Sequence, residues 1–140
     1  MFIGEYTNKI DDKGRLAVPV KFRSELASGA VITRGLDGCL FVYTLSEWRK
    51  LTDSLTNLSL TAANARALNR HMLAGAMEVT LDKQGRVILP GSLRKSAGIA
   101  TQVVVAGVMN RLEIWDETKW REYLEKTEAE STQIAEQIVF

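Results

Sequence analysis

The sequence predicts an α+β fold in which two similar halves share one β-barrel, with helices around it. Three observations support this prediction. A block that reads D-x-x-G-R, followed by apolar residues and a proline, occupies residues 11–19 and again residues 82–90. Short runs that alternate apolar and polar residues, typical of strands, flank each block. Each half is too short to bury a stable core alone, so the two halves are expected to share one core.

The repeat extends beyond the two blocks. At an offset of 71 residues the blocks superimpose, and at an offset of 72 the likeness continues from Tyr43 and Trp115 to Trp48 and Trp120. Self-similarity over such a length indicates two copies of one supersecondary unit. Two copies are too few for a solenoid, so we expect a pseudo-two-fold pair.

Each block predicts a turn between two short strands. The four strands are expected at residues 8–11, 15–18, 79–82 and 86–89. Gly14 and Gly85 close loops of three residues, which suits a type I turn ending in a left-handed glycine. The turn places Asp11 opposite Arg15, and Asp82 opposite Arg86, as cross-strand pairs of opposite charge. Each aspartate can therefore hold its arginine in one orientation.

The prolines that end the blocks predict short helical turns over residues 20–27 and 91–98. Apolar strands are expected next, at residues 30–33, 39–43, 102–105 and 111–115. A helix should follow each half, because Thr44 with Glu47 forms a capping box and Asp116 is a good N-cap. A further helix, from about Ser59 to Leu73, is expected to bridge the halves.

These elements divide the chain into four segments. They are a first half (1–50), a bridging helical segment (51–76), a second half (77–122) and a C-terminal helix extension (123–140). The last helix is expected to pack Trp120, Tyr123, Leu124 and Ile134 inward.

Composition excludes several classes of protein. The chain has 140 residues, 46% of them hydrophobic and 25% charged, which is typical of an ordered globular protein. No apolar run is long enough for a membrane span, and the start does not resemble a signal peptide, so a cytoplasmic protein without membrane contact is expected. One cysteine and one histidine are too few for a zinc site, so we expect no metal and no cofactor.

No signal for catalysis is found. Phosphate-binding glycine loops are absent, and the single histidine has no apparent nucleophile partner. Asp11 and Asp82 resemble a paired-carboxylate site only superficially, because an arginine four residues later would keep each one ionised. We therefore predict that the protein is not an enzyme.

The assembled motifs resemble a known family. IDDKGRLAVPVKFR and LDKQGRVILPGSLR, together with the start MFIGEYTNKIDDKGR, are similar to the MraZ proteins, which are AbrB-like swapped-hairpin proteins. The resemblance implies a swapped-hairpin barrel and a nucleoid-associated transcriptional regulator. It also implies a homo-oligomeric ring that binds short G-rich direct repeats in double-stranded DNA, upstream of the division and cell-wall gene cluster.

By this resemblance Arg15 and Arg86 are the expected DNA contacts, oriented by Asp11 and Asp82. An arginine fork can bond two acceptors on a guanine edge, and a two-stranded ribbon can enter the major groove. Two lysines of the same turns are expected phosphate contacts: Lys13 and Lys83. They are not equivalent positions, because Lys13 aligns with Gln84.

Several alternatives stay open. The aspartate–arginine pairs can be purely structural salt bridges, and Arg23 and Arg94 can serve a barrel or subunit contact, for example with Glu25, rather than DNA. The three tryptophans are expected as core or interface anchors. The rival function is an interaction module, either an antitoxin or an oligomeric scaffold, that binds a protein partner through the acidic C-terminal helix.

Overall fold

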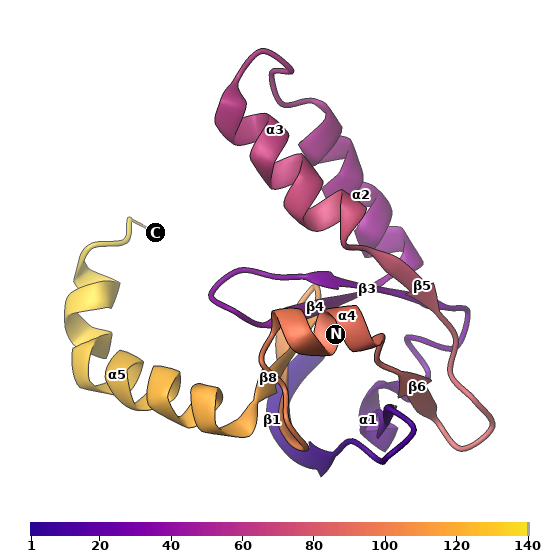
Figure 1. The fold of residues 1–140 in the computed structure, drawn as a ribbon. Helices are drawn as coiled ribbons and strands as arrows, with labels where there is room; N and C mark the ends of the chain where they lie inside the picture. The colour runs from indigo at the N-terminus through magenta and orange to yellow at the C-terminus, as the bar shows by residue number, and fades with distance from the viewer. Residues whose placement is uncertain (140) are drawn as a thin grey trace.

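The computed structural model describes residues 1–139, which form an α+β fold with antiparallel sheets (Figure 1). The first half contains β1 (Phe2–Lys9), β2 (Arg15–Ala17), α1 (Val20–Arg23), β3 (Ala30–Arg34), β4 (Leu40–Thr44) and α2 (Leu45–Thr56). The second half contains β5 (Met77–Val79), β6 (Arg86–Ile88), α4 (Gly91–Ser96), β7 (Gln102–Met109), β8 (Leu112–Asp116) and α5 (Glu117–Glu136). Between them lie α3 (Ala63–Asn69) and the π-helix η1 (Arg70–Ala74). The same order of elements occurs twice, so the repeat is structural.

The sheet pairings have the predicted pseudo-two-fold symmetry. Six strands form a sheet in the order β1-β7-β8-β4-β3-β5, and β2 pairs with β6 in a separate two-stranded sheet. If each strand is exchanged with its counterpart in the other half, the result is the same six-stranded order read from the opposite edge of the sheet. The axis passes between Phe41 and Glu113 in the large sheet and between Leu16 and Val87 in the small one.

The two predicted hairpins differ from the structure. Residues 8–11 and 15–18 were expected to form a regular ladder, but a single bridge between Ile10 and Leu16 joins these segments. β1 instead pairs along its eight residues with β7, and β2 crosses to β6 of the other half. This exchange buries Leu16 and Val87 together, which a local hairpin would not do. The strand order over residues 1–139 ends at β1 and β5, so these pairings alone do not close the predicted barrel.

The main core lies between the two sheets and draws on both halves. It includes Leu16, Val18, Leu40, Val87, Leu89, Val103, Leu112 and Ile114. Phe22 of α1 is fully buried, and its ring meets those of Phe2 and Tyr6 edge-on, at 5.4 Å between centroids in both cases. Such aromatic pairs add to the stabilisation from burial. Phe22 therefore holds β1 against the core.

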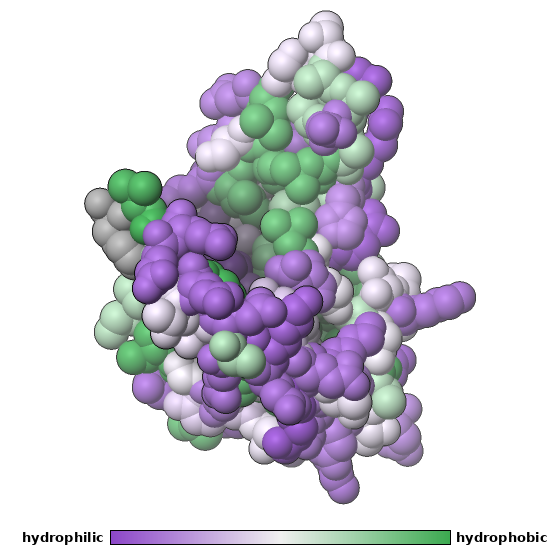
Figure 2. Space-filling model, turned by 90° about the vertical axis from the view of Figure 1, so that its left-hand side faces the viewer, coloured by the Kyte–Doolittle hydropathy of each residue, from purple (hydrophilic) through white to green (hydrophobic). Residues whose placement is uncertain are grey.

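A second apolar cluster covers the other face of the large sheet. Phe41 and Tyr43 of β4 and Trp115 of β8 pack there against Leu55 of α2 and Met72 of η1. Figure 1 shows α2 and α3 rising from the sheet as a helical pair, with α5 leaving on another side. Figure 2 shows apolar side chains gathered along that pair, above the hollow that separates it from the C-terminal segment. Trp48 and Trp120 pack on this cluster, as expected of anchors.

The bridging helix differs in two ways from the prediction. It begins at Ala63 rather than near Ser59, and at Arg70 it changes from an α-helix to a π-helix. Side chains of β3 bind the carbonyl groups at this change: Thr33 donates to Met72, and the Nε of Arg34 donates to His71 at 2.9 Å. These tertiary hydrogen bonds compete with the regular α-helical pattern, and the local sequence does not reveal them.

The predicted caps are present, but the packing of α5 is not as expected. Thr44 accepts a hydrogen bond from the Glu47 N–H, and Asp116 accepts one from the Lys119 N–H. No residue of α5 is buried. Tyr123 and Ile134, both expected to pack inward, are 44% and 39% exposed, although the Tyr123 ring lies 5.0 Å from that of Trp115. The prediction for Ile134 is wrong, because α5 leaves the body after its first turns and has no surface of the described chain to cover it.

Cys39 provides a test of the second cluster. Its thiol is buried, and this burial, with a smaller contribution from Glu113, raises its pKa to about 12. We expect the folded protein to resist alkylation at pH 8 and the denatured protein to react, measured by mass spectrometry of iodoacetamide adducts. Between pH 9 and 12 the thiol ionises in the unfolded chain but stays protonated in the folded protein, so the free energy of unfolding falls over this range. Below pH 9 the thiol is protonated in both states and its ionisation does not affect stability. Equal alkylation rates in the two states would contradict this burial.

Candidate nucleic-acid interface

The two glycine turns have the same geometry. The Gly14 N–H donates to the Asp11 carbonyl and the Gly85 N–H to the Asp82 carbonyl, at 3.0 Å in both turns. The φ angles of the glycines, +79° and +76°, lie in the left-handed region that a side chain disfavours. Both glycines thus have the left-handed conformation that the predicted turn needs.

In each turn one aspartate organises the loop and the arginine. Asp11 Oδ1 accepts the backbone N–H groups of Lys13 and Arg15, and its Oδ2 accepts Arg15 Nε at 2.6 Å. Asp82 repeats this pattern with Gln84 and Arg86, with 2.8 Å between its Oδ2 and Arg86 Nε. The carboxylate thus fixes both the backbone of the turn and the direction of the guanidinium.

These contacts favour the ionised form of the aspartates. The backbone N–H of Arg15 chiefly, and then its guanidinium, hold the pKa of Asp11 below its usual range against partial desolvation. Arg86 lowers the pKa of Asp82 in the same way. A lowered pKa means that the stabilising contribution is present above the ordinary aspartate pKa of about 3.9 and is lost only as pH falls below it. Both pairs are therefore intact at neutral pH.

Each turn is held by the opposite half of the chain. The Gly85 carbonyl accepts from the Val18 N–H at 2.9 Å, and the Gly14 carbonyl accepts from the Leu89 N–H at 2.8 Å. Across the same contact Arg23 lies so close to Gly85 that a methyl group there would clash with it. The two turns are consequently interlocked, and neither is complete without the other half.

Arg23 and Arg94 make contacts within the fold, which is one of the two alternatives that the sequence left open, but their partners differ from the one expected. Arg23 donates its Nε to the Val18 carbonyl at 2.8 Å, while Arg94 lies against Gly14. The considered partner Glu25 instead binds the terminal amine of Met1. Each arginine lies four residues after the proline of its block. This matched spacing indicates that the two have the same structural role, but it does not reveal which residues they contact.

The register of the small sheet brings Arg15 and Arg86 together. Arg15 lies opposite Ile88, and Arg86 lies opposite Ala17. Since Leu16 and Val87 between them face the core, strand alternation directs both arginines to the outer face. They are diagonal neighbours across one ribbon, about 7–8 Å apart in the backbone. Their side chains are 30% and 27% exposed.

The ribbon and its two turns carry four basic side chains beside three aspartates. Lys13 and Lys83 are exposed in the two turns, and neither forms an ion pair with any residue from 1 to 139. Within the same range no residue accepts a hydrogen bond from the Nη groups of Arg15 or Arg86. The aspartates bond only Nε, so the two Nη groups of each guanidinium are left to bind a planar pair of acceptors.

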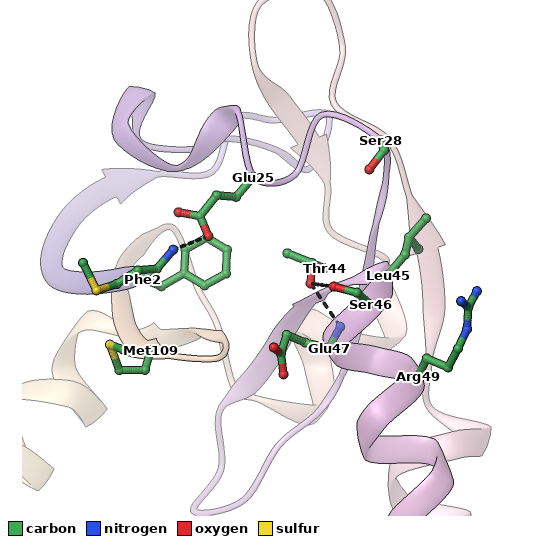
Figure 3. A pocket seen from close by; sticks show the side chains of 10 residues that line it. Phe2, Glu25, Ser28, Thr44, Leu45, Ser46, Glu47, Arg49 and Met109 are labelled. Atoms are coloured by element: carbon green, nitrogen blue, oxygen red, sulfur yellow. Dashed lines mark hydrogen bonds and ion pairs between the residues drawn. The ribbon is translucent and has the colours of Figure 1, made fainter.

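A pocket lies elsewhere, beside the N-terminus (Figure 3). Its volume is about 590 Å³, and it lies between Met109, Glu25 and the start of α2. Glu25 binds the terminal amine there, and Thr44 caps α2 through the Glu47 N–H. None of the predicted site residues lines it. Residues 1–139 contain no grouping of side chains suited to a metal ion and no helix long and apolar enough to span a membrane.

Comparison with known proteins agrees with the duplicated architecture. The sequence model of the family described as "MraZ protein", antitoxin-like, matches residues 1–71 and again residues 72–139. The chain belongs to the MraZ family. Its two MraZ matches correspond to the two structural halves, each with one aspartate–arginine turn.

Individual MraZ relatives align over almost their whole length. The protein named "Transcriptional regulator MraZ" of Natranaerobius thermophilus is 48% identical, over 99% of this chain and 97% of its own. The protein of the same name from Moorella thermoacetica has the same identity and coverage. The protein from Halothermothrix orenii is 47% identical, over 96% of this chain and 94% of its own. Their shared name is that of a regulator and not of an enzyme.

Asp11→Asn tests the orienting role. The amide keeps one acceptor but loses the charge that holds Arg15, so DNA affinity is expected to fall although a negative charge has been removed. A fall of about 3- to 10-fold corresponds to one weakened charge-assisted hydrogen bond. Fluorescence anisotropy on a DNA duplex selected from a random library measures it, and Asp12→Asn, which removes an exposed acid of the same turn, is the control. Tighter binding by Asp11→Asn would show that orientation is not what matters.

Proposed function

We propose that this chain is a transcriptional regulator that binds double-stranded DNA through the outer face of the β2–β6 ribbon. The observation that carries the proposal is the pair of aspartate-held arginines on one exposed face. A two-stranded ribbon fits the major groove, and an arginine fork bonds O6 and N7 of guanine. The names of the MraZ relatives support regulation of transcription.

The finer assignment follows the family resemblance. In this proposal the two halves form an AbrB-like swapped-hairpin barrel, and the interlocked turns support that arrangement. Copies of the chain assemble into a ring whose subunits bind successive short G-rich direct repeats upstream of the division and cell-wall gene cluster. The net charge of only +1 favours such an assembly, because one subunit offers few phosphate contacts and several subunits together gain affinity through effective concentration.

Lys13→Gln tests the phosphate contacts. Because each phosphate contact releases about one counterion, the slope of log affinity against log salt is expected to become shallower by about one unit per engaged subunit. Sequence preference should not change, since phosphates are the same at every base pair. Titrations at four salt concentrations measure the slope, and Lys50→Gln on α2 is the control. An unchanged slope would assign Lys13 to solvent.

The proposed function is tested by selection from a random duplex library followed by gel shift with the full-length chain. Enrichment of a guanine-containing motif is the expected result. The motif should also occur in the DNA upstream of the division and cell-wall genes, where footprinting would reveal it. Failure to enrich any sequence at low salt would exclude sequence-specific DNA binding.

A second candidate is an interaction module that binds a protein partner. The exposed α5, with no buried residue, and the antitoxin-like description of the family favour it. Truncation after Lys126 distinguishes the two candidates. A DNA-binding regulator should keep its affinity per subunit for a single site, whereas an interaction module should lose the partner.

A further inference from the structure

The two arginines are equivalent, but their neighbours on the ribbon are not. Ile88, opposite Arg15, is 60% exposed although it lies in a strand with a buried neighbour on each side. Its counterpart in the other half is Ala17, opposite Arg86. Among the outward residues that flank the arginines, the symmetry is therefore broken by one large apolar side chain.

The turns break the symmetry as well. Lys13 of the first turn aligns with Gln84 of the second, and Asp12 aligns with Lys83. A perfectly two-fold ribbon would bind a duplex equally in both orientations. These differences give the two ends of this ribbon different chemistry.

We propose that Ile88 contacts the 5-methyl group of a thymine beside the guanine bound by Arg15, and that this contact fixes the orientation of the ribbon on a non-palindromic site. The inference rests on the proposed DNA-binding function. It adds which base is contacted, where that base lies in the site and in which direction the ribbon lies on the duplex.

The position of Ile88 favours this ligand chemistry. Arg15 and Arg86 share its face, so a ligand bound there meets two groups of hydrogen-bond donors and one exposed hydrocarbon side chain. The major groove offers partners for both, because thymine places a methyl group beside the O6 and N7 acceptors of a neighbouring guanine. Directly opposite residues on a ribbon have Cβ atoms about 4.5–5.5 Å apart, which is within reach of adjacent base pairs stacked about 3.4 Å apart.

The experiment uses the full-length chain and its selected duplex. Each thymine is replaced in turn by deoxyuridine, which removes only the methyl group, and affinity is measured for the wild type, Ile88→Ala and the control Leu60→Ala. Leu60 is also an exposed apolar residue, 80% exposed, but lies at the end of the α2–α3 pair. The wild type and the control should lose about fourfold in affinity at one thymine, the effect of one buried methyl group. Ile88→Ala should bind the thymine and uracil duplexes equally.

A swap variant tests the polarity. Ala17→Ile with Ile88→Ala moves the apolar side chain to the other arginine, so the sensitive thymine should move to the opposite side of the site. A sensitive thymine that stays in place overturns the proposal.

Other results separate this inference from the proposed function. If no thymine is sensitive, or if Ile88→Ala keeps the sensitivity, the inference fails while DNA binding that depends on Arg15 stands. If Ile88→Ala changes the sedimentation coefficient and leaves the thymine-to-uracil ratio unaltered, Ile88 contacts a second copy through the groove it shares with Met77 and Pro90, and the inference is overturned. A wild-type chain that selects no sequence overturns both.

Discussion

Arg15→Ala combined with Arg86→Ala is expected to abolish sequence-specific DNA binding. Each substitution removes a bidentate donor worth about 1–3 kcal/mol, or about 5- to 150-fold in affinity. The two arginines are neighbours on one ribbon, so comparing the double variant with the single variants also measures the coupling between them. Gel shift with the selected duplex measures the loss, and each single variant should show an intermediate affinity.

The matched control is Arg49→Ala combined with Arg70→Ala. It removes the same charge from exposed positions on α2 and η1, away from the ribbon. A long-range effect of net charge would weaken both double variants alike, whereas a contact at the ribbon affects only the first. Wild-type affinity in Arg15→Ala/Arg86→Ala, with normal folding by circular dichroism, would remove these arginines from the site.

Phe22→Ala is expected to give the largest loss of stability, about 3–5 kcal/mol in the free energy of unfolding. Phe22 is fully buried, and two aromatic rings pack on its edge or face, so the variant loses transfer energy and leaves a cavity. Urea denaturation at a fixed protein concentration measures the change, because self-association would otherwise alter the midpoint.

The control for Phe22 lies two residues away. Val20→Ala on the same helical turn changes a side chain that is 75% exposed, and a change within about 0.5 kcal/mol is expected. A loss below 1 kcal/mol in Phe22→Ala would mean that the aromatic contact does not anchor β1.

Much of the local structure could be predicted from the sequence because it depends on local chemistry. The glycine turns, the aspartate–arginine pairs and the caps at Thr44 and Asp116 each involve residues within four positions of one another. Their geometry follows from turn and capping preferences alone.

The partners of β1 and β2 could not be predicted in this way. Alternation shows which residues of β2 face inward but not which strand lies beside it, so a local hairpin and an exchange with β6 fit the same pattern. The same limit hid the contact of Arg23 with Gly85, which joins residues from different halves. The change to a π-helix at Arg70 likewise depends on bonds from β3.

The interlocked turns have a consequence for biosynthesis. The carbonyl of Gly14 accepts a hydrogen bond from Leu89, which is made 75 residues later. The first turn therefore emerges from the ribosome long before its partner has been made. A nascent or truncated chain that ends before residue 82 contains Arg15 yet lacks the strand that holds it. Incomplete products should therefore lack the proposed DNA-binding surface, which should form in a single late step of synthesis.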